Sequence, residues 1–417
     1  MNESERFLAR HAELSRRFFL RAGVASVAAG WGLTPARGDP LPPELASAVA
    51  KIEPYFTTQE DFGDVSRGKP LPHSLPLEKK KEAGLTRETW KLEVIADPDK
   101  PAKLGKQFTK KDGNALDFEG LLKLGERHAV RFSKVMTCLN IGCPLGMGIW
   151  EGVPLREILW RTEPKENLRR VFYHGYHNDD PKQLFRSSLP VGRVLEDPED
   201  LPPVILCYKL NGEFLTPERG APVRVVVPEA YGFKSIKWLT QISLSNLAYA
   251  NDTYIDGNND VDSPLKTFAA TLSVPINKPK QPIPVTGYAQ VGISGLTKVQ
   301  VWVQPKGKNW PADDPYFTQA PWVDATILGP PEKWGGKLAM EAVPVDTLGF
   351  DAKGQPKVWP MRLSKAHWAI LLPGLEAGEY TLRSRTIDAK GHAQPMPRPF
   401  KKSGRCDIEE VALIVRA

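Results

Sequence analysis

Cys138 stands where a cysteine could hold a metal, at the end of a short apolar run and before a glycine-rich segment. The run 130–136 has the composition of a β-strand, and the segment 142–148 contains three glycines and a proline, which predict a loop. Because a strand end fixes a side chain beside the space left by small residues, a thiolate there could bind a bulky metal cofactor. A buried structural cysteine is the alternative interpretation, since free cysteine is among the most buried residue types.

Cys143 leaves a further alternative open for the same segment. The chain has four cysteines, too few for a disulfide framework, and Cys138 and Cys143 are close enough in sequence to pair. A disulfide between them would remove the thiolate that a metal needs.

The flanking residues predict the elements that would position Cys138. The segment 150–155 leads into a short amphipathic helix over 155–160, and Asp117 is predicted to cap a helix that runs to Gly125. Apolar runs predict further strands at 89–96, 204–208, 223–227 and 235–244.

The polar segment 251–264 predicts a boundary between two parts of the chain. Beyond it, proline and glycine turns separate short apolar runs, a pattern typical of a β-sandwich. The stretch 305–365 is predicted to be an insertion between strands. The runs lie at 268–274, 283–289, 298–303, 368–372, 380–386 and 411–415.

The N-terminus predicts export. Arg16 and Arg17 lie in the sequence SRRFFLR, followed by an apolar run over 22–33 that is too short to span a membrane. Residues 1–38 are therefore interpreted as a twin-arginine signal peptide, with the twin-arginine translocase as a partner, a periplasmic location and no stable membrane span after processing. The twin-arginine route exports proteins that are already folded. A protein whose cofactor is inserted in the cytoplasm would need such a route.

Length and charge restrict the remaining possibilities. A chain of 417 residues is long enough for two or three domains. The net charge is +7, of which residues 1–38, with six Arg and three Glu, contribute +3. The remaining +4 is too mild an excess to indicate nucleic acid as a partner.

Three ordered segments resemble the sulfite oxidase family of molybdopterin-dependent oxidoreductases. The first is Cys138 with its glycine-rich segment, Trp150 and GVPLR over 152–156. The second runs from YKLNGE at 208–213 through RGAPVRVVVP at 219–228 to KWL at 237–239, and the third is VTGYA at 285–289. Over residues 60–417, the resemblance implies an α+β fold: a mixed α/β molybdopterin domain at 39–264, then an immunoglobulin-like β-sandwich dimerisation domain at 265–417, and hence a homodimer.

The resemblance also implies a molybdenum–molybdopterin cofactor and its ligands. Molybdenum would be bound by the pterin dithiolene, oxo groups and one protein thiolate, that of Cys138. Arg219, Arg224, Lys234 and Lys237 would hold the pterin phosphate. The implied catalytic residues are Cys138, Trp150, His177 and Phe185. The implied cofactor-binding residues are Arg67, Lys69, Cys138, His177, Asp179, Arg219, Arg224, Lys234, Ser235, Lys237 and Trp238.

The substrate side departs from the family pattern. Gly142 and Cys143 occupy the place of an arginine-containing pair, and Phe185 that of a tyrosine. His177 stands at a position that is acidic in the family, and Arg219 stands where the family has a histidine. The family's arginine after the third segment would fall near Gly295. Each lost charge-assisted hydrogen bond removes about 1.5–3 kcal/mol, so a dianion would need help from other side chains. Lys69, Arg186 and His174 are the candidates.

Oxidation of sulfite to sulfate by oxygen-atom transfer, with electrons passed to a cytochrome c, is the predicted function. The sequence has no CxxCH haem motif, so the haem would belong to a partner. The alternative keeps the fold and cofactor but changes the substrate, to sulfane or organic sulfur oxidation or to reduction of an S- or N-oxide. A cofactor-free β-rich binding protein is a third possibility.

Overall fold

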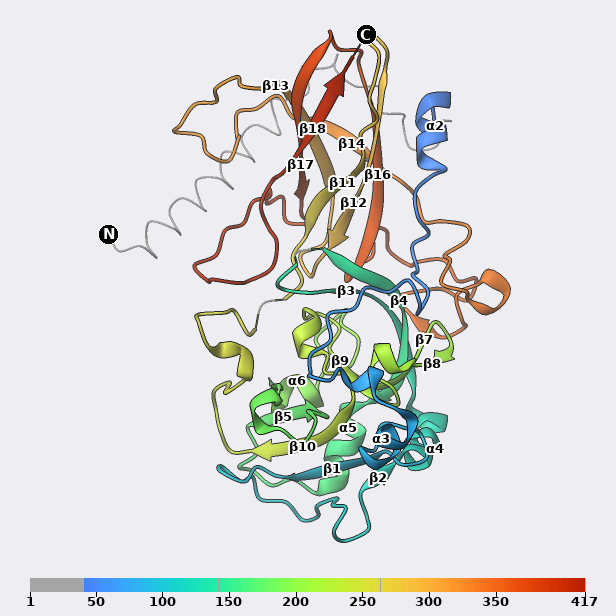
Figure 1. Ribbon diagram of the computed structural model, residues 1–417, viewed down its shortest axis with the longest axis vertical. Helices are drawn as coiled ribbons and strands as arrows, with labels where there is room; N and C mark the ends of the chain where they lie inside the picture. The colour runs from blue at the N-terminus through green and yellow to red at the C-terminus, as the bar shows by residue number, and fades with distance from the viewer. Residues whose placement is uncertain (1–40, 142, 263, 417) are drawn as a thin grey trace.

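The computed structural model describes residues 41–141, 143–262 and 264–416. In Figure 1 these residues form a lower body of mixed helices and strands and an upper body made mainly of long strands. The predicted signal peptide at 1–38 lies outside the described residues.

Two sheets build the lower body. The first has the order β2-β1-β10-β5-β6, and the second has the order β15-β3-β4-β7-β8 with β9 paired to β7. The first comprises β1 (Lys91–Ala96), β2 (Leu116–Asp117), β5 (Arg170–Gly175), β6 (Arg186–Pro190) and β10 (Leu239–Ser245). The second comprises β3 (Val130–Thr137), β4 (Pro144–Pro154), β7 (Ile205–Leu210), β8 (Glu213–Phe214), β9 (Arg224–Val226) and β15 (Thr347–Leu348).

Short helices connect these strands. Helix α4 (Phe118–His128) begins where its sequence predicts, because the carboxylate of Asp117 accepts a hydrogen bond from the backbone N–H of Gly120 at 2.8 Å. The other α-helices of the lower body are α3 (Leu77–Glu82), α5 (Leu155–Leu159) and α6 (Val191–Leu195). Single 3₁₀ turns are η2 (Pro72–Ser74), η3 (Trp160–Thr162), η4 (Pro181–Gln183), η5 (Pro217–Arg219), η6 (Gly232–Lys234) and η7 (Thr253–Ile255).

The glycine-rich segment after Cys138 is mostly strand, so the prediction of a loop over 142–148 is wrong. Strand β4 begins at Pro144 and pairs antiparallel with β3, which ends at Thr137, so Cys138 lies on the segment that joins the two strands. Its glycines permit close packing: a Cβ at Gly148 would lie 2.6 Å from the side chain of Asn211, and one at Gly152 would lie 2.2 Å from the carbonyl oxygen of Leu206. The missing side chains thus make room for β7.

The upper body is one seven-stranded sheet that folds over on itself. Its order is β11-β12-β16-β14-β13-β17-β18, and the first strand also contacts β17 and β18, so the sheet nearly closes into a barrel. Two layers enclose a core of Val, Ile, Leu and Trp side chains, as the sandwich prediction requires. Its strands are β11 (Phe268–Ser273), β12 (Ile283–Val291), β13 (Lys298–Pro305), β14 (Val323–Ile327), β16 (Ser364–Leu372), β17 (Gly378–Ile387) and β18 (Glu409–Val415).

The two bodies exchange elements across the predicted boundary at 264/265. Helix α2 (Pro43–Val49), early in the chain, packs against β12 and β16 of the upper sheet (Figure 1). In return, β15 from the 305–365 insertion, which also contains the 3₁₀ turn η8 (Ala339–Glu341), pairs parallel with β3. Residues far apart in sequence therefore share one core, in which Tyr55 and Phe56 meet Trp334.

His367 belongs to this junction and should make the protein sensitive to acid. Its ring lies 4.1 Å from that of Tyr55, and burial, with help from the charge of Lys365, lowers its pKa from 6.5 to about 3. The unfolded chain therefore binds a proton that the folded chain refuses between pH 6.5 and about 3. Stability should fall by about 1.4 kcal/mol per pH unit as the pH drops through this window.

Chemical denaturation of wild type and His367→Gln at pH 7 and pH 4 measures this contribution. Wild type should lose about 3 kcal/mol more than the variant on acidification. Equal losses in the two proteins would show that His367 does not carry the effect.

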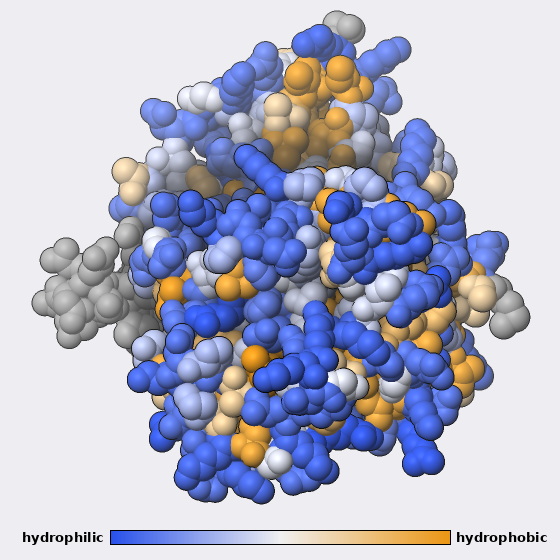
Figure 2. All heavy atoms as spheres, turned by 60° about the horizontal axis from the view of Figure 1, so that its bottom comes forward, coloured by the Kyte–Doolittle hydropathy of each residue, from blue (hydrophilic) through white to orange (hydrophobic). Residues whose placement is uncertain are grey.

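The surface of the lower body is mostly polar. Figure 2 shows hydrophilic residues over most of this face, with hydrophobic residues scattered among them. Among the described residues, no helix has the length and hydrophobicity needed to cross a membrane.

Candidate active site

Cys138 follows directly after β3, at the start of the connection to β4. Its side chain is half-buried, and the thiols of both Cys138 and Cys143 are free, so the structure does not contain the disulfide that the sequence left open. The preceding residue, Thr137, is buried, and its hydroxyl donates a hydrogen bond to Gln290 of the upper body. The strand end is therefore held from both bodies, which fixes where the thiol can lie.

An aromatic and polar group surrounds the connection that carries Cys138. The hydroxyl of Tyr254 donates a hydrogen bond to the side chain of Asn140. Its ring lies 6.2 Å from that of Phe185, and the guanidinium of Arg67 lies 4.6 Å from the centre of the Phe185 ring. A hydroxyl and a cation thus stand close to Phe185, the position where the sequence lacks the family's tyrosine.

Cys143 lies on the same connection and faces the upper body. Burial raises the pKa of the Cys143 thiol, and the nearby charge of Arg405 opposes that shift. The guanidinium of Arg405 also binds Glu409 at 2.9 Å. The upper body therefore contributes a cation, Arg405, next to Cys143, which stands where the family pattern has an arginine-containing pair.

Trp150 is completely buried. Its indole N–H donates to the carbonyl oxygen of Lys134 at 3.1 Å, and the guanidinium of Arg224 lies 5.2 Å from its ring. The side chain belongs to β4 and has no exposed surface, so any influence on a substrate passes through neighbouring groups.

Three cations gather on one side of the lower body: Arg219, Arg224 and Lys237. Arg219 donates to the carbonyl oxygen of Gly63, and Arg224 donates to those of Arg219 and Ser235. Each arginine is only 4% exposed, and its Nε atom is buried without a hydrogen-bond partner among the described residues. Burial lowers the pKa of Arg224 to about 10, which leaves its positive charge intact at neutral pH.

Lys237 completes this cluster. Its ammonium donates to Asp64 at 2.7 Å, to Ser66 at 2.8 Å and to the carbonyl oxygen of Glu218. Burial and the charge of Arg224 lower the pKa of Lys237 to about 8. Partial burial raises the pKa of Asp64, but the hydrogen bonds from Lys237 and Ser66 outweigh it and bring that pKa to about 2. Of the three cations only Lys237 hydrogen-bonds Asp64, while Arg219 lies near both Asp64 and Glu218.

Trp238 and His73 border the cluster. Trp238 has a left-handed backbone (φ 52°), its indole donates to the carbonyl oxygen of Pro217, and its ring stacks on that of His73 at 6.0 Å. The Nδ1 atom of His73 is buried and has no partner within the described ranges. Unsatisfied buried donors and excess positive charge fit an anionic group such as the phosphate of molybdopterin.

Lys234 and Ser235 serve the protein's own interior. Lys234 is buried and pairs with the carboxylate of Asp252 at 2.8 Å, while it also donates to the carbonyl oxygen of Ser188. The hydroxyl of Ser235 accepts a hydrogen bond from the backbone N–H of Val227. The two side chains therefore stabilise the chain around the cluster. Their polar atoms bond to the protein itself and are not directed to a phosphate.

His177, Asp179 and Lys69 lie on two facing loops. His177 is half-buried, with its Nδ1 3.3 Å from the carbonyl oxygen of Gly175, whereas Asp179 is exposed. The backbone N–H of Lys69 donates to the side chain of Gln183, and Lys69 is exposed. No group of three or more His, Cys, Asp or Glu side chains in the described part of the chain could hold a metal ion, and a site with one protein thiolate needs none.

The other cations named from the sequence are already engaged. Arg186 lies 4.7 Å above the ring of Phe172 and donates to the carbonyl oxygen of Asn251. Burial lowers the pKa of His174, which keeps this ring neutral at pH 7. The cations near the Cys138 connection are instead Arg405, which lies near Cys143, and Arg67, which lies over Phe185.

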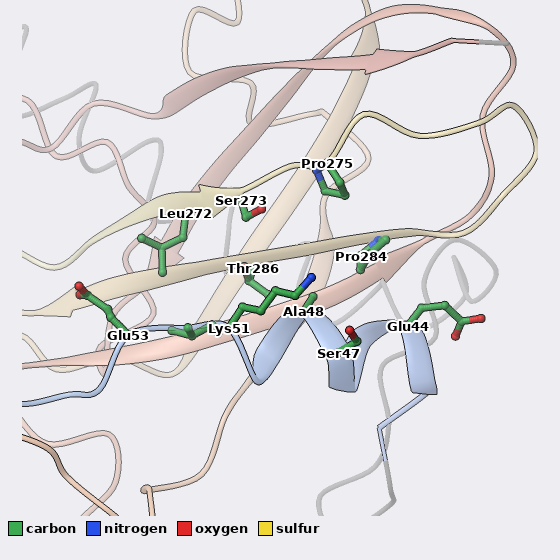
Figure 3. Close-up of a pocket in the computed structure, with 11 residues that line it drawn as sticks. Glu44, Ser47, Ala48, Lys51, Glu53, Leu272, Ser273, Pro275, Pro284 and Thr286 are labelled. Carbon is green, nitrogen blue, oxygen red and sulfur yellow. The ribbon is translucent and has the colours of Figure 1, made fainter.

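A pocket of about 520 Å³ lies elsewhere, between helix α2 and strands β11 and β12 of the upper body (Figure 3). Figure 3 shows the side chain of Lys51 extended along this groove. None of the predicted site residues line it, so it is separate from the site around Cys138. Its lining residues are Glu44, Ser47, Ala48, Lys51, Ile52, Glu53, Leu272, Ser273, Pro275, Pro284 and Thr286.

Comparison with known proteins identifies the class. Residues 85–253 match the family described as the oxidoreductase molybdopterin binding domain. A nitrate reductase [NADPH] from Fusarium oxysporum is 25% identical over 287 residues, covering 59% of this chain and 31% of that protein. A sulfite oxidase from Gallus gallus is 35% identical over 99 residues, covering 23% of this chain and 21% of that protein. The chain thus spans a third or less of the length of these curated relatives.

A solved structure resembles nearly the whole chain. The sulfane dehydrogenase SoxCD from Paracoccus pantotrophus superposes with a TM-score of 0.57 at 18% identity, covering 94% of this chain and 95% of that one. This likeness shows the fold, in agreement with the predicted two-part architecture.

These matches define a molybdopterin-binding oxidoreductase. Residues 85–253 match a molybdopterin-binding oxidoreductase domain and the chain is similar to sulfite oxidases and nitrate reductases, which implies a molybdenum–molybdopterin cofactor, as the sequence predicted. The roles predicted for individual site residues stay predictions. The surroundings of some of these residues fit the predicted role and those of others do not.

Proposed function

We propose that the protein oxidises sulfite to sulfate. In this reaction sulfite and water yield sulfate, two protons and two electrons, and the electrons leave to a cytochrome c. The bound molybdenum supplies oxygen-atom transfer and two-electron chemistry. The match to the molybdopterin-binding oxidoreductase domain and the similarity to sulfite oxidases support the reaction class, and the surroundings of Cys138 support the anionic substrate.

The chain's own residues hold the cofactor in this proposal. The thiolate of Cys138 is the metal ligand, and the rigid end of β3 fixes its direction. Arg219, Lys237 and His73 offer hydrogen-bond donors to the pterin phosphate. The buried guanidinium of Arg224 adds positive charge to the same cluster. Loading the phosphate supplies acceptors to the buried donors that otherwise lack partners.

One observation carries the choice of an anionic substrate. The hydroxyl of Tyr254 meets Asn140, Arg405 lies near Cys143, and Arg67 lies over the ring of Phe185, which packs against Tyr254. The sequence positions expected to supply cations and a hydroxyl hold other residues. Charge-assisted hydrogen bonds from such groups are what a small oxyanion requires.

The test is reduction of cytochrome c by the molybdenum-loaded protein on addition of sulfite. Steady, sulfite-dependent reduction that is absent from metal-free protein is the expected result. A molybdenum-loaded protein that reduces no acceptor with sulfite would overturn the proposal.

A sulfane-type substrate is the second candidate. Phe185 and the uncharged Gly142-Cys143 pair make this site poorer in polar groups than the family pattern, and the similar solved structure is described as a sulfane dehydrogenase. Oxidation of a cysteine persulfide peptide, and reduction of nitrate with a reduced viologen, should be assayed beside sulfite. Faster turnover of either would reassign the substrate while keeping the cofactor.

The upper body is proposed to form a homodimer, as the family resemblance implies for residues 265–417. Such a dimer would be symmetric, with the same surface on both subunits. The domain limits 39–264 and 265–417 stay predictions, since elements cross between the bodies.

Export through the twin-arginine route is proposed from Arg16 and Arg17. Changing both to lysine keeps the charge but removes the paired guanidinium groups, so the protein should accumulate in the cytoplasm. Cell fractionation measures this. Undiminished periplasmic protein from the double variant would contradict the twin-arginine signal, and wild-type protein found only in the cytoplasm would contradict the periplasmic location.

A further inference from the structure

Tyr254 reaches the connection that carries the metal ligand from a distant part of the chain. It lies on η7, between the two bodies, and its hydroxyl meets Asn140, two residues after Cys138. The family resemblance assigns no role to Tyr254. Its position is nevertheless where a substrate-side hydroxyl would be needed, because Phe185 has none.

We propose that Tyr254 is a specificity-determining residue whose hydroxyl donates a hydrogen bond to an oxygen atom of a sulfur oxyanion substrate. The inference deepens the proposed function and rests on it. In the absence of substrate, the side chain of Asn140 accepts this hydrogen bond.

The ring of Tyr254 is held in place by its aromatic neighbours. It stacks on Phe233 with ring centres 5.0 Å apart and an interplanar angle of 20°, and Phe185 packs against it nearly edge-on. A ring fixed between two others loses little rotational freedom when its hydroxyl binds a ligand. Tyr254 is half-buried and Asn140 is exposed, so the bond between them can be exchanged.

The backbone that presents Tyr254 is anchored in the interior. The buried carboxylate of Asp252 accepts hydrogen bonds from Lys234 at 2.8 Å, from Ser187 at 3.2 Å and from the N–H of Ser188 at 3.1 Å. The hydroxyl of Thr253 accepts a further bond from the N–H of Arg186. Lys234 and Asp252 are thus positioning residues for Tyr254.

The hydroxyl stays a donor at neutral pH. Burial raises the pKa of Tyr254. Phenol donors of this kind form strong hydrogen bonds to oxyanions, since bonds to charged groups contribute more than neutral ones.

The test compares the molybdenum-loaded wild type with Tyr254→Phe, which keeps the ring and removes only the hydroxyl. Loss of a hydrogen bond to a charged group should lower kcat/KM for sulfite about 10–100-fold, mainly through KM. Affinity for sulfate, measured by calorimetry, should weaken to a similar degree. The double variant Tyr254→Phe/Phe185→Tyr should recover part of both losses.

Tyr249→Phe is the matched control, because Tyr249 lies on the same segment but is 66% exposed. It should leave both measurements unchanged. If wild type oxidises sulfite and Tyr254→Phe stays within twofold in kcat/KM and in sulfate affinity, the inference is wrong and the proposed function stands. If wild type oxidises no sulfite, the proposed function fails, and sulfate affinity alone decides: weaker binding by Tyr254→Phe supports the inference, and equal binding overturns it.

Discussion

Replacing Cys138 with serine is expected to reduce turnover by at least about 100-fold, since even indirect partners of metal ligands cost about 10–100-fold when removed. The change exchanges a soft, ionisable thiol for a hydroxyl that stays protonated at neutral pH. The pterin should stay bound, because Arg219 and Lys237 hold its phosphate independently. Steady-state kinetics together with pterin and molybdenum content per chain measure the effect.

Cys143→Ala is the matched control, five residues further along the same connection. Its thiol has a raised pKa and lies beside Arg405, so its removal should leave the metal content unchanged and alter only substrate kinetics. If Cys143→Ala lost the metal and Cys138→Ser kept full turnover, the two assignments would have to be exchanged.

Replacing Lys234 with alanine is expected to destabilise the protein by about 3–5 kcal/mol, because the buried carboxylate of Asp252 loses its only cation at hydrogen-bond distance among the described residues. Lys234 and Asp252 are almost completely buried, with side-chain exposures of 3% and 0%. Chemical denaturation of the purified variant measures the loss of unfolding free energy.

Two further variants separate the buried pair from a general effect of losing a lysine. Lys234→Met combined with Asp252→Leu should cost less than Lys234→Ala, since an apolar pair leaves no unpaired charge. Lys306→Ala breaks an exposed pair with Glu379 and should leave the denaturation midpoint unchanged. A Lys234→Ala protein as stable as wild type would mean that this pair does not brace the segment carrying Tyr254.

Local patterns in the sequence predicted most of the elements. The end of β3 at Cys138 and the capping of α4 by Asp117 depend on neighbouring residues, so they could be predicted. The conformation of the glycine-rich part of β4 was predicted wrongly. A glycine that lets a neighbouring strand approach closely and a glycine that makes a turn can stand in the same local sequence. Strand β14 also escaped prediction inside a segment rich in proline and tryptophan.

Several groups at the site could not be predicted because their contacts are long-range. Tyr254 and Asn140 are 114 residues apart in sequence, and no periodicity links them. His73 joins the basic cluster through stacking on Trp238, while the sequence pointed to Lys69. Lys234 and Lys237 lie within one motif, yet one pairs with a buried aspartate and the other stands in the basic cluster; only the fold distinguishes them.

X-ray absorption at the molybdenum edge tests the central claim, that Cys138 binds the metal of a molybdopterin cofactor in this fold. Wild type should contain about one molybdenum per chain, with three sulfur neighbours, two from the dithiolene and one from Cys138. Cys138→Ser should retain the pterin and show two sulfur neighbours. A wild-type protein without molybdenum, or an unchanged sulfur count in Cys138→Ser, would contradict the assignment.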